Sequence, residues 1–219
     1  MAKITISYLY NIFGSNILKI LNNDVKKILV FSPQRTFSNY FETLLEKNFF
    51  IDFENTTNEV KNYNSKIHKH TFNPDLEYLK KHHSDSIIFI LYKNFDLWLK
   101  SLETNDQDFF DHFLPHHNIK IDRNDKIKLK QYYFNWYQNW LNIKNKIKNV
   151  ELVNHKQTLT LENNKKLFKY LKIKYKMYSK GNFKEPSKIR RSASFNKSFY
   201  LNNIEESNSP FVEYFQIIK

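Results

Sequence analysis

Two short apolar runs, each followed directly by a helical pattern, constrain the fold of this chain most strongly. Lys26–Ser32 (KKILVFS) follows charged residues and ends at Pro33, and Ser86–Tyr92 (SIIFILY) has the clearest strand composition in the chain. Runs of this length and composition are typical of strands buried in a parallel sheet. After each run, apolar residues recur at spacings of three and four, which predicts a helix.

Strand-like and helix-like segments also alternate along the rest of the sequence. Further strands are predicted at Phe49–Phe53, Ser65–His70 and Val150–Asn154, and helices at Ser38–Lys47, Leu76–His83, Phe95–Leu102, Lys126–Lys148 and Leu161–Leu171. Irregular structure is expected at Thr104–Asp125 and from Ser179 onward, and an amphipathic segment at residues 1–24. The fold class predicted is therefore α/β: one domain over residues 1–219, with a central, mostly parallel sheet and helices on both faces.

Composition excludes some classes of function and leaves others open. The formal net charge of +13 favours an anionic partner, but the lysines are scattered, as an AT-rich coding sequence would also produce, so no nucleic acid is expected as a partner. The chain has no cysteine, which excludes disulfides, thiolate catalysis and cysteine-zinc sites. No apolar run approaches about 18 residues, so no transmembrane segment is predicted and a cytoplasmic location is expected.

The connection between the first strand and its helix carries residues suited to binding an anion. A helix start presents unpaired backbone N–H groups and a partial positive charge. Arg35 can hold a phosphate or sulfate through two hydrogen bonds, and Ser38 and Asn39 can add side-chain donors. The alternative is an ordinary turn with a Ser or Asn cap and a solvated arginine.

This connection resembles a loop of a known enzyme family. Residues 35–41 (RTFSNYF) are similar to the 5′-phosphosulfate loop of sulfotransferases that use 3′-phosphoadenosine 5′-phosphosulfate (PAPS), which in many bacterial members is P-R-T-G-S-N-Y-L. Phe37 stands where the family has glycine. The resemblance implies a P-loop NTPase-like sulfotransferase fold and a 5′-phosphosulfate site formed by Arg35, Thr36, Ser38 and Asn39. The Walker loop of ATPases, with its two glycines and lysine, is absent from this segment.

A second motif follows the strand at Ser86–Tyr92. Residues 93–101 (KNFDLWLKS) resemble the family pattern K-x-P-Y-A-W-L-x-S, with Phe95 in place of the proline. By this resemblance, Lys93 and Ser101 bind the 3′-phosphate of the donor. The family often supplies a late basic contact to the same phosphate, for which Arg190 is the candidate, although a solvent-exposed basic tail explains that residue equally well.

Candidate catalytic residues lie between the two motifs. Sulfuryl transfer requires a base that deprotonates the acceptor and positive groups that stabilise the leaving phosphate. Family members often carry a Lys-His pair here, so the resemblance implies His70 as base and Lys69 as charge stabiliser. Glu54 is the competing base, and His68 and His70 are alternatively surface residues of a weak strand. The histidines lack the spacing of a zinc site, so no metal is expected.

The leading hypothesis is a sulfotransferase with PAPS as donor, 3′-phosphoadenosine 5′-phosphate (PAP) as product, and a hydroxyl- or amine-bearing acceptor such as a glycan, lipid or small molecule. Thr104–Asp125 and Ser179–Asn203 are expected to line the acceptor side. Two alternatives remain: a family member that has lost catalysis and only binds, and a basic nucleic-acid-binding protein, which would bind in a steeply salt-dependent manner.

Overall fold

The computed structural model describes residues 25–55, 65–103 and 107–186 of the 219-residue chain. The strands are β1 (Lys26–Phe31), β2 (Ile51–Phe53), β3 (Ile87–Tyr92) and β4 (Val150–Asn154). The α-helices are α3 (Ser38–Asn48), α4 (Leu76–His82), α5 (Phe95–Glu103), α6 (Leu114–His116), α7 (Lys126–Lys144) and α8 (Leu161–Tyr175). A π-helical turn, η1 (Phe109–Phe113), precedes α6, and a 3₁₀ turn, η2 (His155–Thr158), follows β4.

The strands form one sheet in the order β2-β1-β3-β4, and every pairing is parallel. Parallel neighbours need a crossover connection, and each connection in this sheet contains at least one helix. Ile28 of β1 is paired with Phe53 on one side and with Ile87 on the other, so β1 and β3 are the two central strands. The predicted α/β class with a parallel sheet is confirmed.

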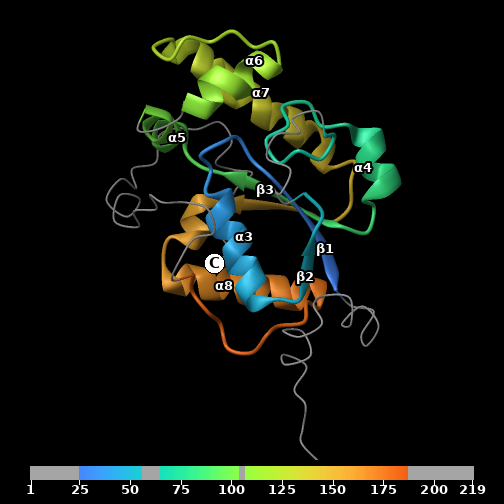
Figure 1. Cartoon of the computed structure of the whole chain (residues 1–219). Helices are drawn as coiled ribbons and strands as arrows, with labels where there is room; N and C mark the ends of the chain where they lie inside the picture. The colour runs from blue at the N-terminus through green and yellow to red at the C-terminus, as the bar shows by residue number, and fades with distance from the viewer. Residues whose placement is uncertain (1–24, 56–64, 104–106, 187–219) are drawn as a thin grey trace, which may run out of the picture.

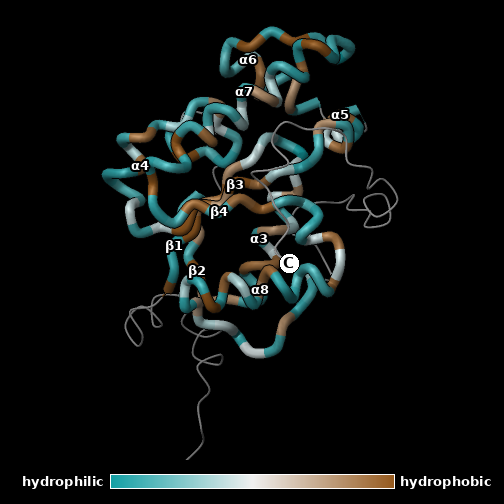
Figure 2. The backbone as a smooth tube through the Cα atoms, turned by 180° about the vertical axis from the view of Figure 1, so that it is seen from behind, coloured by the Kyte–Doolittle hydropathy of each residue, from teal (hydrophilic) through white to brown (hydrophobic). Residues whose placement is uncertain are grey.

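Helices cover both faces of the sheet (Figure 1). Side chains of a strand alternate between faces, so Leu29 and Phe31 pack with α4, α5 and α7, whereas Ile28 and Val30 pack with α3 and α8. Because both faces are buried, β3 is hydrophobic throughout, and β1 is hydrophobic after Lys26 and Lys27 (Figure 2). The predicted two-sided helical cover is therefore confirmed.

Several predicted elements differ from those in the structure. Residues 65–70 form turns instead of a strand, and β2 begins at Ile51, two residues later than predicted. The helix predicted to reach Lys148 ends at Lys144, and the one predicted to end at Leu171 continues to Tyr175. The segment 104–125, predicted to be irregular, contains η1 and α6, in which Phe109 and Phe113 are fully buried.

The described residues after α8 lie against the end of the chain's first crossover, between α3 and β2. Phe50 donates its N–H to the carbonyl of Tyr178 (3.1 Å), and Asn48 bonds through its side chain to the backbone of Lys184 (2.7 and 2.9 Å). Residues 179–186 lie outside regular helices and strands, apart from one bridge between Phe49 and Ser179. The predicted N-terminal amphipathic segment and residues 187–219 lie outside the described residues, and a single domain over the whole chain stays a prediction.

No helix in the described ranges is both long and apolar enough to span a membrane.

Candidate functional site

The carboxyl ends of β1 and β3 form the point at which the chain connections of this sheet diverge. After β1 the chain enters α3, which packs with α8 on one face, and after β3 it enters α5, which packs on the other. In open parallel sheets, ligands bind outside the carboxyl ends of the strands at such a switch point. Both sequence motifs therefore lie at the position where a ligand site is expected.

The loop after β1 has an unusual backbone. Arg35 (φ 61°) and Phe37 (φ 38°) both adopt left-handed conformations, which cost a non-glycine residue roughly 1–2 kcal/mol. Phe37 is also the N-cap of α3, and its side chain cannot accept a hydrogen bond from the first turn. The N-cap side chain therefore satisfies none of the backbone N–H groups at the start of α3, and helix starts of this kind favour anions.

Phe37 occupies the position at which the resembling family has glycine. Its left-handed φ explains why glycine suits that position. Its half-buried ring lies 6.4 Å from the ring of Phe41 and 5.4 Å from that of His155. Packing against these rings offsets the backbone strain, so the loop keeps a glycine-like conformation without a glycine.

Lys93 joins the two motifs. Its ammonium group donates to the carbonyl of Arg35 (3.0 Å) and to the hydroxyl of Ser101 (2.5 Å). Trp98, on the same helix as Ser101, donates its indole N–H to the carbonyl of Gln34 (2.7 Å). Residues predicted separately from two motifs are therefore in direct contact.

The environment of Lys93 disfavours its charge. The side chain is fully buried, and this burial, together with the nearby Arg35 guanidinium, lowers the pKa of Lys93 from 10.5 to about 7. A lysine with such a pKa changes charge near neutral pH. An anion bound next to it would restore its charge, because an opposite charge favours the protonated form.

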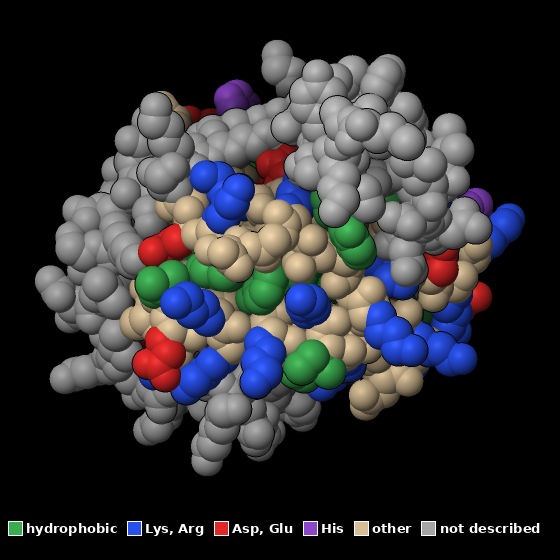
Figure 3. Space-filling view, turned by 90° about the horizontal axis from the view of Figure 1, so that it is seen from below, with side chains coloured by type: hydrophobic (Ala, Val, Ile, Leu, Met, Phe, Trp, Pro, Cys, Tyr) green, Lys and Arg blue, Asp and Glu red, His purple; other side chains and the backbone are tan. Residues whose placement is uncertain are grey.

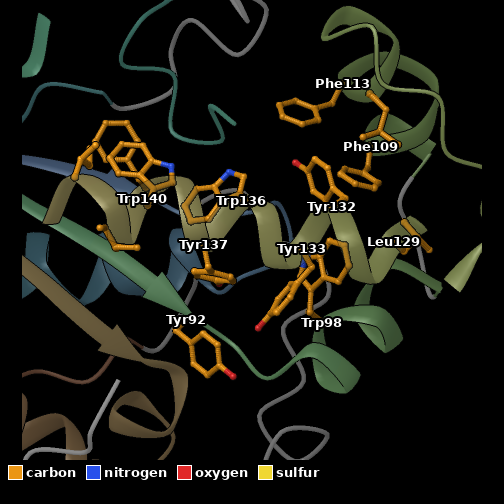
Figure 4. Close-up of a cluster of buried hydrophobic side chains, with 14 of the residues drawn as sticks. Tyr92, Trp98, Phe109, Phe113, Leu129, Tyr132, Tyr133, Trp136, Tyr137 and Trp140 are labelled. Atoms are coloured by element: carbon orange, nitrogen blue, oxygen red, sulfur yellow. The ribbon is translucent and has the colours of Figure 1, made fainter. Parts of the chain in front are cut away.

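Helix α7 holds the end of β3 in place. Tyr137 donates its hydroxyl to the carbonyl of Leu91 (2.8 Å), and the Tyr133 hydroxyl donates to the carbonyl of Lys93. Figure 4 shows the aromatic row of α7 lying between β3 and the side chains of Phe109 and Phe113. The aromatic residues of α7 accordingly belong to the hydrophobic core.

The segment at residues 65–70 reaches the site although it is not a strand. The side chain of Asn55 bonds to both the N–H and the C=O of Val30 (3.0 and 2.8 Å), where β2 has already ended. Beyond it, Ser32 donates its N–H to the carbonyl of Lys69 (3.0 Å), and His70 Nδ1 lies 2.8 Å from the Ser32 carbonyl. These contacts extend the pairing of β1 and bring His70 to its carboxyl end.

His70 has the protonation state of a base. A carbonyl oxygen only accepts, so the nitrogen facing Ser32 carries the proton and Nε2 is the basic nitrogen of the neutral ring. Burial, and next the charge of Lys69, hold the pKa of His70 well below its usual range, which keeps the ring neutral at pH 7. Arg35 also contributes to this lowering, so Arg35, Lys93 and His70 share one electrostatic environment.

Lys69 is held by the first turns of α3. Its ammonium group donates to the Asn39 side-chain oxygen (2.8 Å) and lies 3.4 Å from the carboxylate of Glu42, and both Lys69 and Glu42 are buried. Sequence reasoning did not identify Glu42, because its helical position resembles that of a solvated glutamate. The pair ties the segment at residues 65–70 to α3 and balances part of the charge of Lys69.

Thr36, Ser38 and Arg190 are the remaining residues predicted to bind the donor. Thr36 is buried in the loop near the Tyr137 hydroxyl, and Ser38 is buried as the first residue of α3. Arg190 lies outside the described residues.

Glu54 lies away from the other candidates. Its carboxylate accepts from the Ser86 hydroxyl (2.5 Å), lies 2.9 Å from His83 Nδ1 and pairs with Lys27 (3.5 Å). Ser86 directly precedes β3 and Lys93 directly follows it, so this cluster is about 20 Å from Lys93 along the strand. The structure does not bring Glu54 together with Arg35, Lys93 and His70.

His155 was not predicted, although it directly follows β4 and so lies at the same sheet end. It is buried, and burial, with further contributions from the charges of Lys93 and Lys156, lowers its pKa to about 3. Its position directly after a predicted strand, at Val150–Asn154, was the signal that could have identified it.

Part of the segment predicted to line the acceptor side also reaches this end of the sheet. The ring of Phe113 lies 6.4 Å from that of His70 and 6.3 Å from that of His68. Burial, and then the neighbouring His117, lowers the pKa of His68 to about 4, so the histidines beside Phe113 are uncharged at pH 7. Over the described ranges, no cluster of three His, Asp or Glu side chains is arranged to hold a metal ion.

These observations define an α/β protein with an all-parallel sheet in its described part and with cationic and basic side chains gathered at the switch point. Comparisons of the chain with models of known protein families, with curated proteins and with solved structures found no match.

Proposed function

We propose that this protein is a sulfotransferase that binds PAPS at the carboxyl ends of β1 and β3 and releases PAP. The proposal includes the P-loop NTPase-like sulfotransferase fold and an acceptor that carries a hydroxyl or amine. It rests on the sequence resemblance together with one observation in particular: the contact of Lys93 with both Ser101 and the Arg35 carbonyl.

That contact supports the proposal because of the shape of the donor. PAPS carries a phosphosulfate at one end of its ribose and a phosphate at another, so it needs two anion-binding groups at one sheet edge. The loop at Arg35 and the pair Lys93–Ser101 supply these groups from two different crossovers. The start of α3 adds backbone N–H groups next to Arg35.

The reaction assigns a role to each group. The acceptor oxygen or nitrogen attacks the sulfur in line, and the bond between the sulfur and the bridging oxygen of the 5′-phosphate breaks. His70 Nε2 takes the proton from the acceptor. Arg35 and the N–H groups of α3 stabilise the negative charge that develops on the leaving PAP. Lys69, which is bound to Asn39 and Glu42, positions the start of α3.

Isothermal titration with PAP tests the binding step. We expect saturable, one-to-one binding by the full chain and roughly tenfold weaker binding by Ser101→Ala, since a hydrogen bond to a charged group contributes about 1.5–3 kcal/mol. Glu54→Gln is the matched control and should keep the wild-type affinity, because Glu54 lies at the other end of β3. Absence of PAP binding at millimolar concentration would refute the proposal.

A second function is favoured by Phe37, whose ring lies against His155 next to the start of α3. A side chain at this position restricts how closely a phosphosulfate can approach the backbone, and a protein of this kind binds the nucleotide without turnover. Release of PAP from PAPS, measured with phenol, alcohol and amine acceptors, separates the two functions. Binding of PAP with no release in the presence of any acceptor would support the binding protein.

A further inference from the structure

The outward face of α8 carries a single row of basic side chains. The row consists of Lys165, Lys169 and Lys172 of α8 and the C-cap residue Lys176, at spacings of four, three and four, and all four are exposed. Residues at these spacings lie on one side of a helix. The row is about 16 Å long, at a rise of about 1.5 Å per residue.

The charges of this row are not balanced within the described part of the chain. Glu162 pairs with Lys166 (3.0 Å), which lies beside the row. Glu151 of β4 accepts from Lys174, Tyr170 and Tyr175 on the side of α8 that faces the sheet. In residues 25–55, 65–103 and 107–186, no carboxylate forms an ion pair with the four lysines of the row.

Exposed apolar side chains gather at the same helix. The large hydrophobic side chains exposed in the described ranges are those of Leu161 (44%), Ile173 (67%) and Tyr178 (45%), together with Ile127 on α7. Three of these four therefore lie on α8 or within three residues of its end. Figure 3 shows Lys and Arg side chains gathered around hydrophobic ones on the lower face of the molecule, where α8 lies in Figure 1.

We propose that the outward face of α8 docks on a bilayer surface that contains anionic lipids. Lysines attract anionic head groups, and their long flexible stems let the ammonium group stay at head-group level while apolar neighbours enter the interface. Ile173 and Leu161, on either side of the lysine row, and Tyr178 are the side chains that enter.

A bilayer explains this face better than a nucleic acid does. A phosphate backbone would bind the lysines but would leave Ile173, the most exposed apolar side chain of the helix, in water. The exposed residues of α8 also include no arginine, the side chain that reads bases most often. The inward face of the helix is already fixed by Leu167 and Leu171 in the core, so docking needs no folding of the helix.

Co-sedimentation of the full chain with lipid vesicles tests the proposal. We expect binding to phosphatidylcholine vesicles that contain 30% phosphatidylserine and none to vesicles of phosphatidylcholine alone. Each lysine near such a surface contributes about fivefold to partitioning, so the double variant Lys169→Ala, Lys172→Ala should bind about 25-fold more weakly. Ile173→Ser should also weaken binding, because it removes apolar contact without changing charge.

The double variant Lys80→Ala, Lys81→Ala is the matched control. It removes the same charge from α4, which packs on the opposite face of the sheet, and should bind vesicles as the wild type does. Circular dichroism establishes that each variant is folded, since all four lysines are exposed. The proposal is overturned if the protein does not bind vesicles that contain phosphatidylserine, or if the α8 variants bind them as strongly as the wild type. It is also overturned if the α8 lysine substitutions weaken binding to RNA or DNA but not to vesicles.

Discussion

Replacement of Lys93 by methionine should remove most of the pH dependence of stability between pH 7.5 and 9.5. In the folded protein, burial lowers the pKa of Lys93 to about 7, against 10.5 for a solvated lysine. Between these values the unfolded chain holds one proton more than the folded protein. The free energy of unfolding therefore rises with pH in this window.

The size of this effect follows from the proton difference. One proton contributes about 1.4 kcal/mol per pH unit, and Lys93 is already mostly neutral at pH 7.5, so the gain from pH 7.5 to 9.5 is about 2.5 kcal/mol. The histidines with lowered pKa values act below this window, because both folded and unfolded forms are neutral within it. Buried tyrosines, whose pKa values are raised above 10, act above it.

Urea denaturation at pH 7.5, 8.5 and 9.5, followed by the fluorescence of the three buried tryptophans, measures the slope. Lys180→Met is the control: this lysine also donates to a backbone carbonyl, that of Glu46 (2.7 Å), but is only half-buried, and its variant should keep most of the slope. A flat wild-type profile, or the same slope in Lys93→Met, would refute the buried and mostly neutral state of this lysine. Saturating PAP should also flatten the profile, because a phosphate at Lys93 restores its charge.

Three further predictions concern the loop and the base. Phe37→Gly should raise PAP affinity by roughly three- to tenfold in a titration, since without the ring the phosphate can gain a backbone hydrogen bond, which contributes about 0.5–1.5 kcal/mol; unchanged or weaker binding would show that the ring does not limit access. Trp98→Phe should lower the free energy of urea unfolding by about 1–3 kcal/mol, because the buried Gln34 carbonyl loses its donor, and a smaller loss would mean that water replaces the indole. His70→Gln should reduce turnover of PAPS at least 100-fold while PAP affinity stays within about twofold, and retained turnover would exclude His70 as the base.

Much of the candidate site was predictable because its residues directly follow strands that are obvious in the sequence. The run that forms β3 is wholly apolar, and the run that forms β1 is apolar after Lys26 and Lys27, so their carboxyl ends were clear, and Arg35 and Lys93 could be assigned to one sheet edge. Ser101 was predicted from the resemblance of residues 93–101 to the family motif. These inferences use the local pattern of a few residues, the rule that parallel strands share an edge, and the motif resemblance.

Residues whose place depends on distant partners could not be predicted in this way. Residues 65–70 were predicted to be a strand, yet they are held by Ser32, and Asn55 supplies from its side chain the hydrogen bonds that a longer β2 would have made. Glu54 also follows a strand, but β2 ends before it reaches the level of the carboxyl ends of β1 and β3. The carboxylate of Glu54 therefore accepts from Ser86, at the opposite end of β3 from Lys93.

By itself, the sequence determined the alternation of strands and helices and the identity of the residues at the ends of β1 and β3. Periodicity and strand composition are properties of neighbouring residues, so they can be recognised in the sequence without knowledge of the fold. Only the tertiary structure decided that β1 and β3 are adjacent, that Lys93 therefore reaches the Arg35 carbonyl, and that the lysine is buried enough for its pKa to fall to about 7. Burial and charge balance are set by groups far apart in the chain, and no local pattern records them.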